Sequence, residues 1–353
     1  MIPTTTGTLD ARNPLGLDGI DFVEITTPDP EALARILRDF GFSRLMRHGT
    51  HAIDYWRQHD IHVLVNLEPD TASHRFMQAH GPSISAMGWR VKNAHAAAHD
   101  ARARGARLAV GDYLRHGELV PALAGIGDML LYMIDDRGDD RWRRMGFVPL
   151  DAPELVPDRG FRVIDHLTNN VARGTMAPLV DFYKSVFGFT EVRTFDIRGQ
   201  KTGLRSFALR SPCGSFCIPI NEGNEDASQI DEYLREYRGP GVQHLAFLTD
   251  DIVASLSAMR GSSVRMLDID PSYYESVFER VPGVTEDPAT LRGLQILVDG
   301  DPEGYLLQIF TQNLLGPIFI EVIQRKNHHS FGEGNFGALF RSIERDQEAR
   351  GAL

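Results

Sequence analysis

Cysteine is scarce in this chain, because only Cys213 and Cys217 occur among its 353 residues. Two cysteines cannot form a disulfide framework, and their spacing in Cys-Gly-Ser-Phe-Cys lacks the partner cysteines that a zinc site needs. A chain of this length can bury a sizeable apolar core without covalent cross-links. We therefore expect a protein of a reducing compartment whose fold rests on its core.

Long apolar runs and an excess of basic charge are also missing. The longest apolar stretch, residues 119–134, is interrupted by Pro121 and Asp128, so it is too broken to cross a bilayer. Residues 1–14 carry neither the basic nor the apolar region of a signal peptide. Asp and Glu number 48 against 37 for Lys and Arg, and the net charge of −11 argues against a nucleic-acid binder, which needs a basic stripe. The sequence predicts a cytoplasmic protein that binds neither membranes nor nucleic acids.

The two halves of the chain repeat one pattern. An apolar strand, a helix with proline in its first turn and a Gly-Phe pair follow one another in residues 20–42 and again in residues 163–189. A Gly-Pro pair then opens an extended run in each half, and the apolar run at residues 130–134 matches the one at residues 306–310. Repeats at this scale indicate duplicated supersecondary units. The pattern predicts an α+β fold of mixed, largely antiparallel curved sheets with helices outside.

The proline-rich stretch at residues 149–160 is the natural linker between the halves. It predicts an N-terminal domain over residues 1–150 and a C-terminal domain over residues 160–353. The second half carries extra sequence at residues 190–239 that the first half lacks. Added length of this kind more often carries function than packing.

Three ligand-capable residues stand in apolar strands of the second half. His166, His244 and Glu321 are each flanked by apolar residues, and a buried carboxylate is costly unless it is paired, protonated or bound to a metal. Two imidazoles and one carboxylate, with three positions left open, form the ligand set of non-haem Fe(II) oxygenases. The matching positions of the first half hold Glu24 and Ala86, so only the second half has the ligand-capable pair of histidines.

Simpler interpretations of these residues stay open at this point. A strand histidine is more often a hydrogen-bonded core residue, and Glu321 has Arg325 close by as a salt-bridge partner. Other histidines are weaker candidates. His95 and His99 are spaced i, i+4 on a helix face that we expect to be exposed, and the pair at 328–329 lies in a polar loop that we expect to be solvated.

Five longer motifs follow one another in the second half. They are residues 163–171, 241–247, 306–311, 318–325 and 331–340, which read VIDHLTNNV, GVQHLAF, LLQIFT, IFIEVIQR and FGEGNFGALF. In length, order and spacing they resemble the 4-hydroxyphenylpyruvate dioxygenase family, and the resemblance covers nearly the whole chain. It implies the vicinal-oxygen-chelate fold, with βαβββ modules duplicated in each half, a catalytic C-terminal barrel and a C-terminal helix that closes over it.

The resemblance also implies a set of site residues. The ligands of one Fe(II) per chain would be His166, His244 and Glu321, so that the N-terminal half is structural. The implied catalytic residues are Gln308 and Phe336. The residues implied to contact the substrate are Ser206, Pro219, Asn221, Gln229, Gln243, Phe310 and Phe340. Strict strand alternation puts Gln243 and His244 on opposite faces, so we expect either a bulge there or a Gln243 that supports the site from behind.

The activity that the resemblance implies belongs to tyrosine and phenylalanine catabolism. The family converts 4-hydroxyphenylpyruvate and O2 into homogentisate and CO2 by oxidative decarboxylation, ring hydroxylation and side-chain migration. The resemblance further implies a homo-oligomer, either a dimer or a tetramer.

Two alternative functions stay open. One is a 4-hydroxymandelate synthase, which would use the same iron and substrate but carry a smaller aliphatic residue in place of Phe336. The other is a non-catalytic binding protein of the same fold. Phe336 and Pro219 favour the dioxygenase, and the three ligand residues disfavour the binding protein.

Overall fold

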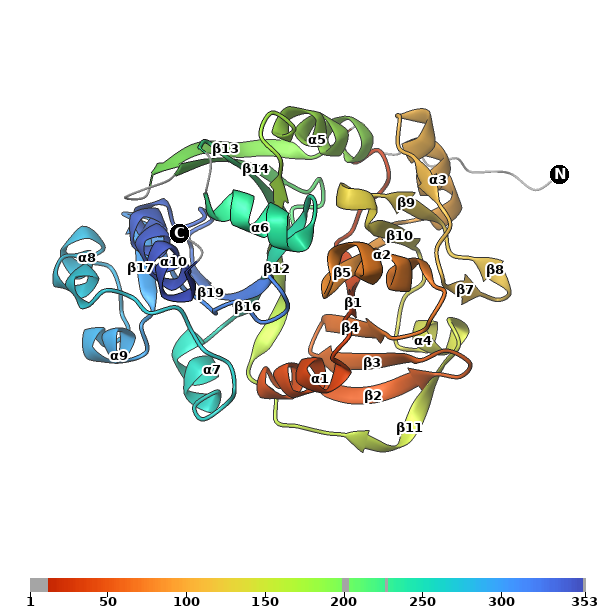
Figure 1. The fold of residues 1–353 in the computed structure, drawn as a ribbon, viewed down its shortest axis with the longest axis horizontal. Coiled ribbons are helices and arrows are strands. Elements are labelled where there is room, and N and C mark those ends of the chain that lie inside the picture. Colours follow the sequence, from red (N-terminus) through yellow and green to blue (C-terminus); the bar gives the residue numbers. More distant parts are fainter. Residues whose placement is uncertain (1–11, 199–202, 226–227, 352–353) are drawn as a thin grey trace.

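The computed structural model describes residues 12–198, 203–225 and 228–351, and it builds two curled sheets that lie side by side (Figure 1). The first half of the chain, red to yellow in Figure 1, forms one sheet, and the second half, green to blue, forms the other. Most neighbouring strands in both sheets are antiparallel, and helices cover the sheets from outside. The α+β class predicted from the sequence is confirmed.

The first sheet has nine described strands in the order β11-β2-β3-β4-β1-β5-β10-β9-β6. These strands are β1 (Ile20–Thr26), β2 (Ser43–His48), β3 (Ile53–Gln58), β4 (Ile61–Asn66), β5 (Ser83–Arg90), β6 (Leu108–Ala109), β9 (Ala122–Ala124), β10 (Leu130–Ile134) and β11 (Phe147–Glu154). The other elements of this half are α1 (Pro30–Asp39), α2 (Ala72–His80), α3 (Ala94–Ala103), α4 (Asp140–Arg144) and the short ribbon of β7 (Leu114–Arg115) and β8 (Glu118–Leu119).

The second sheet has eight described strands in the order β13-β14-β15-β12-β16-β19-β18-β17. These strands are β12 (Phe161–Val171), β13 (Thr190–Arg198), β14 (Gly203–Arg210), β15 (Cys217–Gly223), β16 (Gly241–Thr249), β17 (Leu297–Asp301), β18 (Gly304–Phe310) and β19 (Phe319–Lys326). The helices are α5 (Met176–Phe182), α6 (Gln229–Tyr237), α7 (Ile252–Ala258), α8 (Val277–Arg280), α9 (Pro288–Gly293) and α10 (Phe336–Arg350).

Strand pairing shows how the two halves correspond. The first strand of each half, β1 or β12, pairs with one neighbour in parallel and with the strand after the Gly-Pro pair in antiparallel fashion. That second strand then pairs in parallel with β10 in the first half and with β19 in the second. The predicted match of residues 130–134 with residues 306–310, which form β18, is therefore wrong. Short apolar runs resemble one another, and only the pairing identifies β19 as the counterpart of β10.

The cores of the two halves are continuous. The rings of Phe40 in the first half and of Phe161 and Phe247 in the second lie with their centroids 5.8–5.9 Å apart. Trp89 of β5 packs edge-on against Phe187 at 4.7 Å. Because Phe161 and Phe247 belong to β12 and β16, the first half supports the two strands that carry the histidines of interest.

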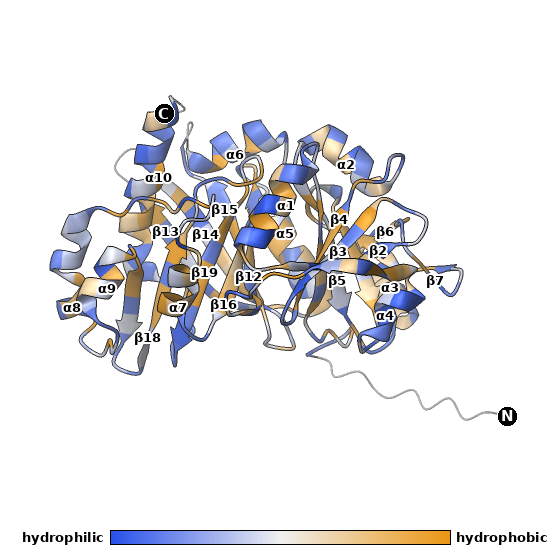
Figure 2. Ribbon diagram, turned by 90° about the horizontal axis from the view of Figure 1, so that it is seen from below, coloured by the Kyte–Doolittle hydropathy of each residue, from blue (hydrophilic) through white to orange (hydrophobic). Residues whose placement is uncertain are grey.

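The predicted linker contributes to the first sheet. Strand β11 continues past the predicted boundary at residue 150 as far as Glu154, whose carboxylate pairs with Arg38 and Arg44 at 2.9 Å. Apolar colours concentrate on the strands and hydrophilic colours on the outer faces of helices such as α2 and α6 (Figure 2). None of the helices in the described ranges has the length and hydropathy that a membrane-spanning helix needs.

Candidate metal centre and substrate pocket

Three adjacent strands of the second sheet bring His166, His244 and Glu321 together. His166 lies on β12, His244 on β16 and Glu321 on β19, and all three side chains are buried. One carboxylate oxygen of Glu321 is 3.0 Å from Nε2 of His166 and 3.5 Å from Nε2 of His244. The three ligand atoms lie within 4.8 Å of one another. Two imidazole nitrogens and one carboxylate oxygen at this spacing suit a divalent metal ion.

Two β-bulges in the pairing of β12 with β16 orient His166 and His244. The register shifts between Ile164 and His166 and again between Thr168 and Asn169, so that Asp165 and Gln243 have no partner across the ladder. A bulge lets consecutive side chains lie on the same side of a sheet. Gln243 consequently lines the same pocket as His244, with its Oε1 3.3 Å from Nδ1 of that histidine. Of the two arrangements expected for Gln243, the bulge is the one observed.

The protonation states of the three residues suit a site where binding of a metal cation displaces a proton. Burial lowers the pKa of His166, but Glu321 and Asp165 outweigh it and raise the pKa to about 9. Burial raises the pKa of Glu321, whereas His166 and His244 hold it below its ordinary value. Burial lowers the pKa of His244. At neutral pH one proton therefore occupies the position between ligand atoms that a dication would take.

We expect metal binding to release about one proton per ion near pH 7, because His166 is protonated below its pKa of about 9 and only the neutral imidazole binds metal. The proton competes below that pKa and is absent above it, so metal affinity should rise about tenfold per pH unit and level off near pH 9. Calorimetry with Co(II) in buffers of different ionisation enthalpy measures the proton count. Binding without proton release would contradict this charge state.

The remaining residues implied by the family resemblance all line one pocket with the three ligand residues. The pocket encloses about 640 Å³ of space between atoms, which includes its opening to solvent. Among these residues the polar ones come from β14, β15, β16, β18 and the start of α6, and the aromatic ones from β18 and α10. The lining includes Ser206, Pro219, Asn221, Gln229, Gln243, Gln308, Phe310, Phe336 and Phe340.

Gln308 has the strongest structural mark of a ligand-binding residue among these. Its side-chain oxygen is buried and has no hydrogen-bond partner among the described residues, and such a group is costly unless a ligand or water satisfies it. Gly332 passes close to it with a φ of +78°, and a Cβ there would lie only 2.0 Å from Oε1 of Gln308. The glycine of the FGEGNFG motif therefore makes room for the Gln308 amide.

Sequence reasoning missed several pocket residues. Phe319 stacks on the His244 ring at 4.6 Å, Phe331 packs edge-on against His166 at 5.6 Å, and the Thr168 hydroxyl lies 3.0 Å from Nε2 of His244. Phe319 is two residues from Glu321, and Thr168 is two residues from His166. Strand alternation places residues two apart on one face, so this spacing was available as a signal.

One alternative left open for Glu321 is excluded, and one expectation about a neighbouring histidine is wrong. Arg325 does not pair with Glu321; its guanidinium forms two 2.8 Å hydrogen bonds with the carboxylate of Asp165. His328 is buried rather than solvated, because its ring lies 2.9 Å from the Ser330 hydroxyl and 3.6 Å from Asp301. His95 and His99 are exposed on α3, as expected.

The corresponding place in the first half is filled rather than open. Glu24 is buried on β1 and accepts hydrogen bonds from Ser73, Ser85 and Tyr113. Ala86 lies opposite Glu24, and the pairing of β10 with β5 puts Tyr132 where the second half has Glu321. Among the described residues the only group of potential ligands close enough to hold a metal is the one in the second half.

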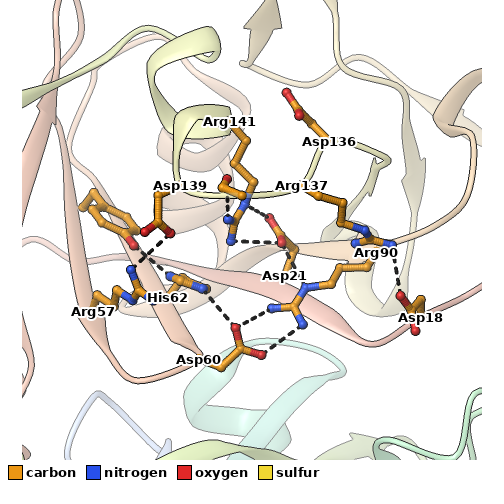
Figure 3. A network of polar contacts seen from close by, with 12 residues as sticks. Asp18, Asp21, Arg57, Asp60, His62, Arg90, Asp136, Arg137, Asp139 and Arg141 are labelled. Atoms are coloured by element: carbon orange, nitrogen blue, oxygen red, sulfur yellow. Dashed lines mark hydrogen bonds and ion pairs between the residues drawn. The ribbon is translucent and has the colours of Figure 1, made fainter.

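Other charged residues of the first half also satisfy one another (Figure 3). Asp21 pairs with Arg90 and Arg141, and Asp60 accepts two 3.0 Å hydrogen bonds from Arg90 and lies 3.4 Å from His62. Figure 3 shows these side chains directed at one another. The network holds the fold of this half and leaves none of its five members free as a ligand.

We expect Glu24→Gln to lower the free energy of unfolding by about 1–3 kcal/mol, because an amide cannot satisfy three hydrogen-bond donors in a buried place. The metal content should stay at one ion per chain and the product should not change. Thermal melting, elemental analysis and chromatography of the products measure the three quantities. Two ions per chain in the wild type would show that the first half is misinterpreted.

Comparison with known proteins identifies two matching family models. The model described as "Hydroxyphenylpyruvate dioxygenase, HPPD, N-terminal" matches residues 11–147. The model described as "Glyoxalase/Bleomycin resistance protein/Dioxygenase superfamily" matches residues 163–309. The two matches fall on the two halves that carry the two sheets.

Curated relatives and solved structures match over nearly the whole chain. Protein MelA of Shewanella colwelliana is 57% identical over 344 residues, which cover 97% of this chain and 99% of that protein. The 4-hydroxyphenylpyruvate dioxygenase of Pseudomonas aeruginosa is 45% identical over 352 residues, which cover 98% of each. A mutant of 4-hydroxymandelate synthase from Streptomyces coelicolor superimposes with a TM-score of 0.81 at 27% identity, covering 94% of this chain and 99% of that one.

Proposed function

This chain belongs to the 4-hydroxyphenylpyruvate dioxygenase family, and from that premise we propose that it binds one Fe(II) and converts 4-hydroxyphenylpyruvate and O2 into homogentisate and CO2. The ligands are His166, His244 and Glu321. The observation that carries the proposal is the convergence of these three buried donors on one pocket that every other residue implied by the family also lines.

The charge of the pocket supports a metal-dependent reaction on a keto acid. Neither lysine nor arginine lines the described pocket, and Glu321 brings a negative charge. A 2-oxo acid is anionic, and the charge of the protonated His166 is balanced by Glu321, so the protein alone offers the acid no net counter-charge. Fe(II) held by the three protein ligands would supply that charge, together with the Lewis acidity and redox chemistry that a reaction of the keto acid with O2 needs.

The side chains of the pocket orient the rest of the substrate. Ser206 on β14 lies directly across from Asn221 on β15, and with Gln229 at the start of α6 these residues form a polar wall that suits a phenol hydroxyl. Phe336 and Phe340 are four residues apart on α10, so they share a face and form an apolar wall for the ring. Water exclusion by this wall protects the reacting groups.

The test is anaerobic loading of the protein with Fe(II), followed by addition of 4-hydroxyphenylpyruvate and O2 and chromatography of the products. Homogentisate and one equivalent of CO2 per O2 consumed are expected. A second candidate, 4-hydroxymandelate synthase, is favoured by the likeness to the solved synthase, and it would give 4-hydroxymandelate in the same experiment. Absence of O2 uptake with the loaded protein would refute both.

We further propose that the enzyme acts in tyrosine and phenylalanine catabolism in the cytoplasm. Both cysteines are free thiols, which agrees with a reducing compartment. The homo-oligomer, a dimer or a tetramer, stays a prediction from the family resemblance.

A further inference from the structure

A largely buried ion pair lies behind one of the proposed metal ligands. Nδ1 of His166 donates a 2.7 Å hydrogen bond to Oδ2 of Asp165, and Arg325 donates from Nε and Nη2 to the two oxygens of the same carboxylate at 2.8 Å. The side chains of Asp165 and Arg325 are 13% and 14% exposed. Neither residue lines the substrate pocket. The pair therefore reaches the site through the residues that it holds, foremost the His166 imidazole.

The bulge at Asp165 makes this contact possible. In a regular strand the side chain of Asp165 would lie on the opposite face from His166, but the register shift leaves Asp165 without a cross-strand partner. The same device recurs at the second histidine, where Gln243 occupies a bulge with its Oε1 near Nδ1 of His244. In both cases the preceding residue accepts at Nδ1, which leaves Nε2 directed at Glu321.

Arg325 also holds the segment that leads into α10. Its Nη1 donates to the backbone carbonyls of His328 at 3.1 Å and Ser330 at 2.6 Å. The next residue, Phe331, packs edge-on against the His166 ring. The Arg325 guanidinium thus holds the Asp165 carboxylate on one side of His166 and the backbone next to Phe331 on another side.

We propose that Asp165 and Arg325 are positioning residues that fix the His166 imidazole with Nε2 toward the metal and couple this orientation to the seating of residues 328–331. The inference rests on the metal site of the proposed function. A carboxylate behind a ligating histidine fixes its tautomer and ring orientation, and removing such a partner typically weakens metal binding about 10–100-fold. A lysine cannot replace Arg325, since one ammonium group cannot reach both carboxylate oxygens and two carbonyls.

The experiment measures metal binding without turnover, with Co(II) as the probe. We expect Asp165→Ala and Arg325→Gln to raise the Co(II) dissociation constant about 10–100-fold and to change the visible ligand-field spectrum of bound Co(II). Asp165→Asn keeps the acceptor for Nδ1 and should show a smaller loss. Arg325→Lys should resemble Arg325→Gln in metal affinity. Hydrogen exchange in residues 328–331 should become faster in both Arg325 variants and in Asp165→Ala.

A matched control is available on the same strand. Arg162 of β12 pairs with Asp250 at 2.9 Å, but both side chains are at least half exposed. Arg162→Gln removes an ion pair without touching His166, so its Co(II) affinity and spectrum should equal those of the wild type. Unchanged affinity and spectrum in folded Asp165→Asn and Arg325→Lys, with only a lower melting temperature, would overturn the proposal and leave the metal site intact. A wild-type protein that binds no Co(II) would instead refute the proposed function.

Discussion

Replacing His166, His244 or Glu321 by alanine abolishes metal retention and turnover in our expectation, while the protein stays folded. Each residue supplies one of three ligand atoms that lie within 4.8 Å of one another, and the described pocket offers no further His, Cys, Asp or Glu as a substitute. The loss of metal affinity should exceed the roughly 10–100-fold that removal of a residue behind a ligand causes. Elemental analysis after gel filtration and O2 uptake with 4-hydroxyphenylpyruvate measure the two losses.

Removing His166 or Glu321 leaves the other residue without its counter-charge, but that residue can lose or gain a proton, and all three side chains border an existing cavity. Stability should therefore fall only modestly. A change of about 1–2 kcal/mol in the free energy of unfolding is typical of single substitutions. His62 is the matched control, since it is a buried strand histidine of the first half with hydrogen-bond distance to Tyr55 and an ionic neighbour in Asp60. His62→Ala should lower stability and keep the metal. An alanine variant at any of the three ligand positions with undiminished activity would refute the assignment.

The fold class was predictable from the sequence because the repeated pattern implies two sheets with a similar order of strands. Two copies of a strand, helix and Gly-Pro pattern require two similar sheets, and the structure has them. Register was not predictable in the same way. The runs at residues 130–134 and 306–310 are equally apolar, and only hydrogen bonding to β5 and β16 shows that β10 corresponds to β19.

The candidate site was likewise predictable only in part. Ligand-capable residues in apolar strands can be recognised from the sequence. A glutamate flanked by apolar residues, such as Glu321, is chemically unusual whatever the position of its strand in the sheet. The bulge at Asp165 could not be predicted from the sequence, and the bulge at Gln243 was only one of two alternatives, because a bulge depends on how two strands pair. The sequence likewise left open whether Arg325 pairs with Glu321, and the structure shows that it pairs with Asp165 instead.

Phe336 is expected to decide which carbon of the substrate is attacked. It is the first residue of α10, borders the pocket and meets Phe195 edge-on at 5.2 Å. It is only partly buried and packs on a small cluster beside the pocket instead of the main core. A large aromatic side chain there limits how far the substrate ring can tilt, and a displacement of about 1 Å is enough to redirect a reaction with strict attack geometry.

Phe336→Ile should therefore make 4-hydroxymandelate at the expense of homogentisate. The smaller side chain opens part of the aromatic wall, so the benzylic carbon can approach the oxidant in place of the ring. Loss of packing should lower the free energy of unfolding by about 1–3 kcal/mol, which melting experiments register separately.

The control is Phe182→Ile, because Phe182 of α5 is also partly buried against apolar neighbours but does not border the pocket. That variant should lose stability and keep the product. Chromatography of the two products distinguishes steering from packing, because a residue that only packs changes the melting temperature and leaves the product ratio as it was. A folded and active Phe336→Ile enzyme that makes homogentisate alone would show that the wall at this position does not steer the attack.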